Sequence, residues 1–308
     1  MSNDRRMELP TTPLMGVLSH ALRGAIVPTP GKLLYVADYS SIEARVVMWL
    51  AGEQHALDLF RTGADIYLDM AGDIYGRVCT KADTRERGMG KIAILGLGYQ
   101  MGWSKFQSQC ADAGAVIDDE FAQQVVRAYR SKYAKIQQMW WDTEAAAIAA
   151  VLRGRNHHSA PHNHGAYHVE WTLDGRFLRC VLPSGRSLAY PDPRIEKRQT
   201  PWGESKNALT YMGVNSYTRK WTRQAAYGGL LVENITQAVA RDIMAEAMVR
   251  CERDGRYLPV LTVHDELVCE GSPRGSVKVF ERLVAASPAW ADGLPIACEG
   301  WKGTRYHK

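Results

Sequence analysis

Two aspartates, each beside apolar strand-like runs, constrain the fold of this chain more than any other feature. Asp38 ends residues 32–37, a short apolar run that follows a Pro-Gly break and predicts a buried strand. Asp265 stands between two further predicted strands, 257–263 and 267–270. A carboxylate beside apolar strands is unfavourable unless it is solvated, paired or bound to a metal. Two aspartates on neighbouring strands would repel each other, and a pair of divalent cations would relieve that repulsion.

The spacing of these aspartates alone leaves two interpretations open. His264-Asp265-Glu266 is either the polar tip of a hairpin or part of a two-metal site for phosphoryl transfer. Both interpretations place a polar turn between two apolar strands.

The composition narrows the class of protein. Hydrophobic residues make up 46% and charged residues 23% of the 308 residues, which excludes a mainly disordered, collagen-like or coiled-coil chain. No apolar run reaches the roughly 18 residues of a membrane span, and the N-terminus lacks the apolar core of a secretory signal. A net charge of +5 permits a nucleic-acid partner without demanding one. The six cysteines form no C-x-x-C pair, so we expect reduced thiols in a cytoplasmic protein.

Helical and strand patterns follow one another irregularly, which favours an α+β fold over a doubly wound sheet. Residues 177–182 and 187–190, joined by Pro-Ser-Gly-Arg, predict a hairpin. Helices are expected over 42–51, 56–76 (as one or two helices), 83–99, 118–152, 229–253 and 276–286.

Three motifs occur in the order known from one enzyme family. Residues 38–45, DYSSIEAR, resemble the first palm motif of DNA polymerase family A, whose usual form is D-Y-S-Q-I-E-x-R. Residues 263–266, VHDE, resemble the second palm motif of that family. Between them, the pattern Arg87-x3-Lys91-x3-Leu95-x3-Tyr99-x2-Gly102 resembles the fingers helix of that family, whose usual form is R-x3-K-x3-F/Y-x3-Y-G. The flanking sequences, at 22–26 and 232–237, are most similar to phage members.

The resemblance extends from about Leu22 to Tyr306 and implies a fold. That fold is a right-hand palm, an antiparallel sheet with flanking helices, together with helical fingers. The implied domains are an N-terminal segment with the first part of the palm over 1–55, mainly helical fingers over 56–176, and the second part of the palm over 177–308. Only 37 residues precede Asp38, so we expect the thumb and the exonuclease to be absent from this chain.

The resemblance also implies template-directed DNA synthesis, in which a nucleotidyl group passes from a dNTP to a primer 3′-hydroxyl. It implies Asp38, Asp265 and Glu266 as catalytic residues. It implies two Mg²⁺ ions, replaceable by Mn²⁺, held by Asp38, Asp265 and the carbonyl of Tyr39.

The expected partners are primer–template DNA and dNTPs, with no membrane, and a separate chain that carries thumb or exonuclease parts. The expected location is the cytoplasm, which for a phage protein is that of the host. Two alternatives are a noncatalytic DNA-binding subunit of a phage replication complex and a metal-dependent phosphohydrolase or nuclease. The intact motif carboxylates weigh against the first, and the fingers stripe has no purpose in the second.

Residues four apart share one helix face, so Arg87, Lys91, Leu95 and Tyr99 form a stripe. Without the palm motifs this stripe would be an ordinary basic helix face. Given the resemblance, the two cations grip the triphosphate and the tyrosine lies near the templating base. Leu95 departs from the family, which has Phe or Tyr there. Glu43 is implied to exclude a 2′-hydroxyl together with Tyr99, and otherwise it is a first-turn acid favoured by the helix dipole.

The remaining candidates concern DNA and flexibility. Arg23 and Gln237 match positions that touch the minor groove of the new duplex. The resemblance also implies contacts of His264 with the primer end and of Gly102 with DNA. Glycines 88, 90, 96 and 98 each cost about 1 kcal/mol in a helix, which predicts a mobile fingers helix.

A polar loop holds five histidines without the spacing of a zinc site, namely His157, His158, His162, His164 and His168.

Overall fold

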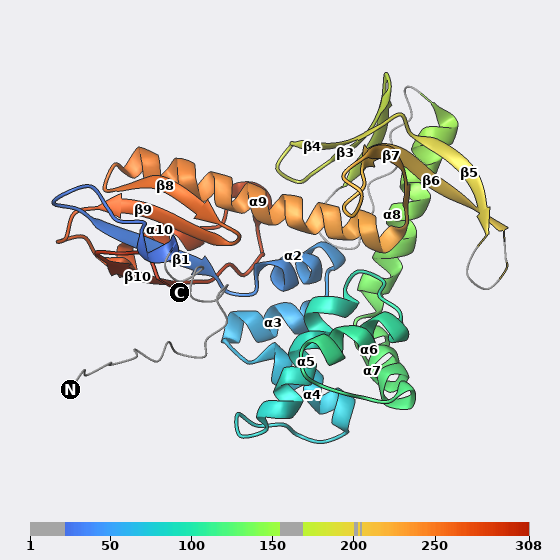
Figure 1. The fold of residues 1–308 in the computed structure, drawn as a ribbon, viewed down its shortest axis with the longest axis horizontal. Coiled ribbons are helices and arrows are strands. Elements are labelled where there is room, and N and C mark those ends of the chain that lie inside the picture. The colour runs from blue at the N-terminus through green and yellow to red at the C-terminus, as the bar shows by residue number, and fades with distance from the viewer. Residues whose placement is uncertain (1–21, 155–168, 200–202, 204, 308) are drawn as a thin grey trace, which may run out of the picture. The chain divides into compact units, whose positions relative to one another are not determined.

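The computed structural model describes residues 22–154, 169–199, 203 and 205–307, and they divide into two compact units (Figure 1). The first unit holds residues up to Ser40, Met244–Ala286, and the chain from Ala297 onward. The second unit holds Ser41–Ile243 and Ser287–Ile296. Within the described residues, no helix combines the length and the apolar character needed to cross a bilayer.

The first unit is built on a four-stranded antiparallel sheet. Its strands lie in the order β10 (Cys298–Gly303), β1 (Leu33–Tyr39), β9 (Glu266–Gly271) and β8 (Tyr257–Val263). The helix α10 (Val277–Ala285) packs against β1 and β10. Strand β1 is an unbroken apolar run because it is central and both of its faces are covered.

The two faces of this sheet have different cores. On one face, the rings of Tyr35 and Phe280 flank Tyr257, with centroids 4.9 and 5.2 Å from the Tyr257 centroid. On the other face, Leu34 and Val36 pack with Val268 and Tyr306. The C-terminal segment therefore forms part of the core of this unit.

The second unit is mainly helical in its first part. Glycines in the left-handed conformation end three of its helices, because only this residue adopts a positive φ without strain: Gly52, Gly63 and Gly76. The helices are α2 (Ile42–Ala51), α3 (Gln54–Thr62), α4 (Ile66–Tyr75), α5 (Thr84–Leu97), α6 (Trp103–Asp112), α7 (Asp119–Lys132) and α8 (Ala134–Arg153), with a short 3₁₀ helix at Ala289–Ala291.

Two three-stranded antiparallel sheets follow α8 along the chain. The first consists of β2 (Glu170–Asp174), β3 (Phe177–Val181) and β4 (Ser187–Pro191), and the second of β5 (Arg194–Gln199), β6 (Ser205–Val214) and β7 (Trp221–Ala226). The long helix α9 (Gly228–Asp254) comes next, and its residues up to Ile243 belong to the second unit.

The structure confirms the α+β class and most predicted elements, with some differences. The expected helix over 118–152 is two helices, because the backbone of Tyr133 (φ −111°, ψ 56°) interrupts it. Helix α6 and the strands β2, β5, β6, β7 and β10 were not predicted. Ser41 stands at the start of α2 with a φ of 54°, and its hydroxyl bonds that of Tyr67 at 2.7 Å instead of capping the helix. The domain boundaries expected at 55 and 176 stay a prediction.

Candidate functional site

The two motif aspartates lie at one end of the sheet in the first unit. In the antiparallel register, Asp38 on β1 stands opposite Glu266 on β9. The backbone N–H of Tyr39 donates to the carbonyl oxygen of Asp265 at 3.2 Å. Asp38, near the end of β1, and Asp265, in the turn just before the adjacent strand β9, therefore lie at the same end of the sheet, and both are only partly exposed.

The turn between β8 and β9 is strained at His264. Val263 pairs with Glu266, so His264 and Asp265 alone make the turn. His264 has a φ of 53° and is exposed. A left-handed backbone is costly for a β-carbon residue and is normally left to glycine or asparagine. A two-residue hairpin commonly has a positive φ at its first turn residue, so this backbone fits a plain hairpin tip as well as a functional turn.

The buried side chain of Glu266 is hydrogen-bonded by Tyr306, a residue that the sequence analysis did not identify. It is 3% exposed, and its Oε2 accepts a hydrogen bond from the hydroxyl of Tyr306. Burial first, and then the carboxylate of Glu266, raise the pKa of Tyr306 to about 12. Nothing in the local sequence marks Tyr306, because its partner lies forty positions earlier in the chain.

The segment that contains Arg23 is fixed by the same C-terminal residues. The N–H of Tyr306 donates to the carbonyl of Ile26 at 3.0 Å, and Arg305 donates to the carbonyl of Gly24. Arg23, half-buried, is near enough for its charge to lower the pKa of Tyr306 against the larger opposing effects. Arg23 and Glu266 thus share the surroundings of Tyr306.

The donors at this end of the sheet fit a hard divalent cation. Asp38 and Asp265 offer carboxylate oxygens and Tyr39 a carbonyl, which are the ligands that Mg²⁺ prefers. Among the described residues, no group of three or more His, Cys, Asp or Glu side chains could hold a metal ion by itself. A metal here would therefore complete its coordination with water and substrate phosphates, which is how Mg²⁺ is usually held.

In the second unit, Arg87, Lys91 and Leu95 lie along α5, with the two cations in different settings. Tyr99 lies in the turn after the helix, because α5 ends at Leu97 and not at the expected residue 99. The Nε of Arg87 lies 2.6 Å from Asp65 Oδ2, and its guanidinium is 5.2 Å from the centre of the Tyr67 ring. Asp65 also caps α4 by accepting from the N–H groups of Tyr67 and Leu68. Lys91 is exposed. Nothing in the local sequence indicates that Arg87 has an acidic partner.

A hollow of about 300 Å³ at the end of α5 brings four predicted residues together. They are Glu43, Leu95, Tyr99 and Gly102. Burial first, and then the carboxylates of Glu43 and Glu233, raise the pKa of Tyr99. Glu233 also lines this hollow, although it is not among the residues that the resemblance implies.

Close backbone packing fixes the position of Tyr99. The N–H of Gly229, at the start of α9, donates to Gln100 Oε1 at 2.9 Å. A Cβ at Gly229 would lie 2.3 Å from the carbonyl oxygen of Tyr99, so only glycine fits. Gln100 itself has a φ of 65°.

Two glycines of α5 also lie close to neighbouring helices. A Cβ at Gly90 would lie 2.1 Å from the carbonyl oxygen of Tyr67, and a Cβ at Gly96 would lie 2.6 Å from Gln109 Oε1. Gly90 therefore lets the backbone of α4 approach α5, which the interpretation as flexibility alone did not foresee. At Gly96 the close atom is the end of a flexible side chain, which could move aside. A Cβ at Gly88 would meet nothing within 4 Å.

Other predicted residues lie apart from these groups. Gln237 is exposed on α9, within the second unit. The histidine loop, residues 157–168, lies outside the described residues.

Comparisons with known proteins give the family. The model of DNA polymerase family A matches residues 6–153. The chain is 38% identical over 297 residues to the DNA polymerase of Bacillus phage SP02, covering 95% of this chain and 44% of that protein. It is 31% identical over 268 residues to DNA polymerase I of Chloroflexus aurantiacus, covering 85% of this chain and 22% of that protein.

The chain belongs to DNA polymerase family A.

A solved structure shares the fold of this family A chain. It is the POL domain of Pol1 from M. smegmatis in complex with DNA primer-template and dNTP, with a TM-score of 0.59 and 20% identity, covering 95% of this chain and 43% of that one. The chain spans less than half the length of the curated relatives named above.

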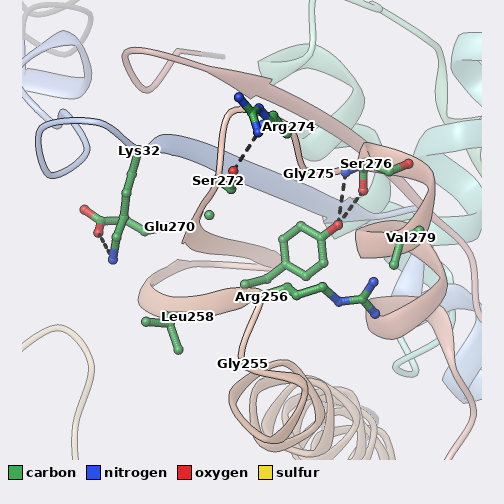
Figure 2. A pocket seen from close by; sticks show the side chains of 12 residues that line it. Lys32, Gly255, Arg256, Leu258, Glu270, Ser272, Arg274, Gly275, Ser276 and Val279 are labelled. Carbon is green, nitrogen blue, oxygen red and sulfur yellow. Dashed lines mark hydrogen bonds and ion pairs between the residues drawn. The ribbon is translucent and has the colours of Figure 1, made fainter.

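A second hollow in the family A palm sheet lies away from the aspartates. It measures about 520 Å³ and is lined by Lys32, Tyr257 and Ser276, among others (Figure 2). Tyr257 pairs with Gly271, at the opposite end of β9 from Glu266. The hydroxyl of Tyr257 donates to the carbonyl of Ser276 at 2.8 Å. This hollow contains none of the predicted site residues.

Proposed function

We propose that this chain carries out template-directed DNA synthesis. The observation that carries the proposal is the placing of Asp38 and Asp265 at one end of adjacent strands, within two motifs of a family whose members are DNA polymerases. Growth of a DNA strand requires transfer of a nucleotidyl group from a dNTP to the primer 3′-hydroxyl, with pyrophosphate as the leaving group. Two carboxylates with a neighbouring carbonyl are suited to that in-line displacement.

The palm residues would act by holding and orienting the reactants. Asp38, Asp265 and the carbonyl of Tyr39 would hold two Mg²⁺ ions. Bound there, the ions would make the 3′-hydroxyl easier to deprotonate and would neutralise charge on the phosphates. Glu266 would keep the end of β9 in position through its bond to Tyr306. The strained turn at His264 would aim Asp265 and present the imidazole to the primer end.

The fingers residues would bind the nucleotide. Lys91 is exposed and would meet the triphosphate as a point charge. Arg87 would offer its planar guanidinium, with Asp65 as a competing partner. The bound triphosphate would therefore replace Asp65 as the partner of the Arg87 guanidinium.

The hollow beside Tyr99 would select the sugar. Glu43 and Tyr99 would fill the space of a 2′-hydroxyl, because both line the hollow at the end of α5. Leu95 lines the same hollow and would contact the nucleotide through an aliphatic side chain instead of an aromatic ring. Arg23 and Gln237 would test base pairing through minor-groove acceptors, and Gly102 would let the template approach the backbone.

Primer extension by the purified chain with Mg²⁺ and dNTPs tests this function. Asp38→Ala and Asp265→Ala should each abolish nucleotide addition without unfolding the chain. Asp112→Ala, at an exposed aspartate on α6, should extend primers as the wild type does. Near-normal addition by either palm variant would refute the assignment, and primer shortening would favour a nuclease.

A partner chain with thumb or exonuclease parts belongs to the same proposal. Longer products when such a chain is added would support it.

A further inference from the structure

The positive charge of this chain is concentrated in the sheet β5–β7. Residues 192–226 contain seven basic and three acidic residues, a net charge of +4 out of +5 for the whole chain. This segment lies outside the residues that the family model matches. It contains none of the candidate residues of the polymerase site, so its charge needs a separate explanation.

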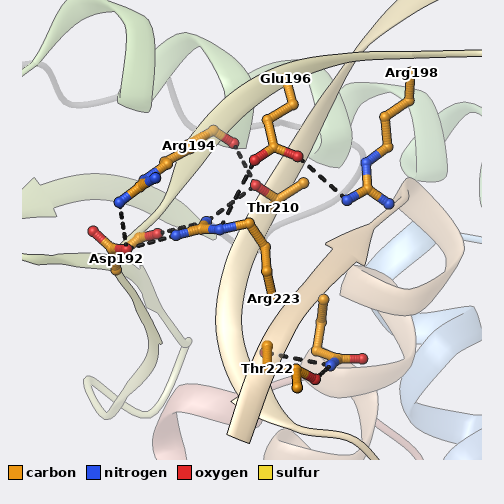
Figure 3. Close-up of polar contacts among 8 residues, drawn as sticks. Asp192, Arg194, Glu196, Arg198, Thr210, Thr222 and Arg223 are labelled. Carbon is orange, nitrogen blue, oxygen red and sulfur yellow. Dashed lines mark hydrogen bonds and ion pairs between the residues drawn. The ribbon is translucent and has the colours of Figure 1, made fainter.

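At the base of the hairpin β6–β7, a network of ion pairs engages two of the three acidic residues, Asp192 and Glu196 (Figure 3). Arg223 donates to Asp192 Oδ2 at 2.5 Å and to Thr210 Oγ1 at 3.1 Å. Its Nε lies 3.8 Å from Glu196 Oε1. Two further arginines pair with the same acids, Arg194 with Asp192 at 3.1 Å and Arg198 with Glu196 at 3.3 Å. The base is therefore cross-linked, and its arginines already have partners.

The tip of the hairpin is a defined turn. Val214 pairs with Trp221 at the end of the ladder. The Oδ1 of Asn215 accepts from the N–H groups of Tyr217, at 3.1 Å, and Thr218, at 2.9 Å. The N–H of Asn215 donates to the carbonyl of Lys220 at 2.9 Å. These bonds fix the backbone of the turn and turn its remaining side chains outward.

The side chains at this tip are aromatic and basic, and they are exposed. Tyr217 is 94% exposed and Trp221 is 58% exposed. Arg219 and Lys220 are exposed between them, and neither makes an ion pair with a described residue. Val214, at the same tip, is 58% exposed. Exposed apolar side chains gathered in one place indicate an interaction surface.

We propose that the tip of this hairpin, residues 214–221, binds the unpaired part of the template strand. Aromatic rings stack on the faces of unpaired bases of any sequence, and neighbouring cations bind the phosphates. A paired duplex hides its base faces, so the aromatic pair favours single strands over duplex. The two cations and the charge of the segment favour nucleic acid over a protein surface. This inference deepens the proposed polymerase function and takes its choice of ligand from it, because a primer–template leaves part of the template strand unpaired.

Fluorescence anisotropy of labelled primer–template, without dNTPs, tests the inference independently of catalysis. The wild type should bind a template with a long 5′ overhang more tightly than one with a short overhang. Tyr217→Ala with Trp221→Ala should weaken binding to the long overhang about fivefold or more and leave the short-overhang affinity unchanged. Phe at both positions should restore most of the affinity, because phenyl rings still stack.

The charge contribution has its own matched variants. Arg219→Gln with Lys220→Gln should weaken long-overhang binding and lower its salt dependence. Lys278→Gln with Arg282→Gln removes the same two charges from exposed positions of α10 and should leave the difference between overhangs intact. Unchanged long-overhang affinity in the aromatic variant, as for a hairpin that binds a protein, would overturn the inference. An equal loss on both overhangs would overturn it too, because the tip would then contact duplex.

The outcome is distinguishable from failure of the polymerase proposal. If the wild type adds no nucleotides yet the overhang effect depends on the tip, the hairpin site stands and the catalytic assignment falls. If primers grow but the tip variants bind all substrates as the wild type does, the reverse holds.

Discussion

Replacing Tyr306 by phenylalanine tests the support beneath Glu266. The variant removes only the hydroxyl that donates to the buried carboxylate. A hydrogen bond to a charged group contributes about 2 kcal/mol, against about 1 kcal/mol for a bond between neutral groups. Tyr35→Phe is the matched control, because the Tyr35 hydroxyl donates to a neutral acceptor, the carbonyl of Ser272, at 2.7 Å in the same unit. For a chain of 308 residues, we expect Tm to fall by about 3 °C in Tyr306→Phe and about 1.5 °C in the control.

The same variant has a signature at alkaline pH. The pKa of Tyr306 is about 12 in the fold, above its ordinary value of 10.0, because of burial and then Glu266. Between these pH values the unfolded chain binds fewer protons than the folded one, so stability falls as pH rises. Tyr306→Phe should remove this part of the alkaline loss.

Thermal unfolding followed by circular dichroism, from neutral pH to about pH 11, measures both effects. Equal Tm losses in the two variants, or an alkaline loss that persists in full without the Tyr306 hydroxyl, would refute this reasoning.

Three further predictions concern the nucleotide side of the site. Glu43→Ala should raise ribonucleotide use relative to deoxyribonucleotide about tenfold, measured by single-nucleotide addition, and an unchanged ratio would exclude Glu43 as the sugar gate. Gly229→Ala should sharply lower addition, because its methyl group would collide with the Tyr99 carbonyl, while a fully active variant would contradict that packing. Asp65→Ser keeps a good cap for α4 but releases Arg87, so Tm should change little and the KM for dNTP should fall; a higher KM would show that Asp65 helps to position Arg87.

Local sequence patterns predicted three strands of the palm sheet, because each of them is a short apolar run that can be recognised without knowing its partners. The apolar run that ends at Asp38 became β1, and the two runs around Asp265 became the adjacent strands β8 and β9. Helix α2 has the predicted bounds. In each case a continuous pattern in a short window determines the element.

Contacts between distant positions could not be predicted in the same way. The bond between Tyr306 and Glu266, and the pairing of Arg87 with Asp65, join residues whose local patterns say nothing of each other. Gly90 looked like a helix-weakening residue, but its need for close packing against Tyr67 depends on the neighbouring helix. Strands β5–β7 were missed because mixed polar residues there give no clear alternation.

The most direct test of the central claim is single-nucleotide addition on templates that differ only in the first unpaired base. Each template is offered each dNTP in turn, with Mg²⁺ and an end-labelled primer. We predict that the wild-type chain adds the complementary nucleotide to each template, and that Asp38→Ala and Asp265→Ala add none. Addition that ignores the template base, or addition that survives the loss of either aspartate, would contradict the account.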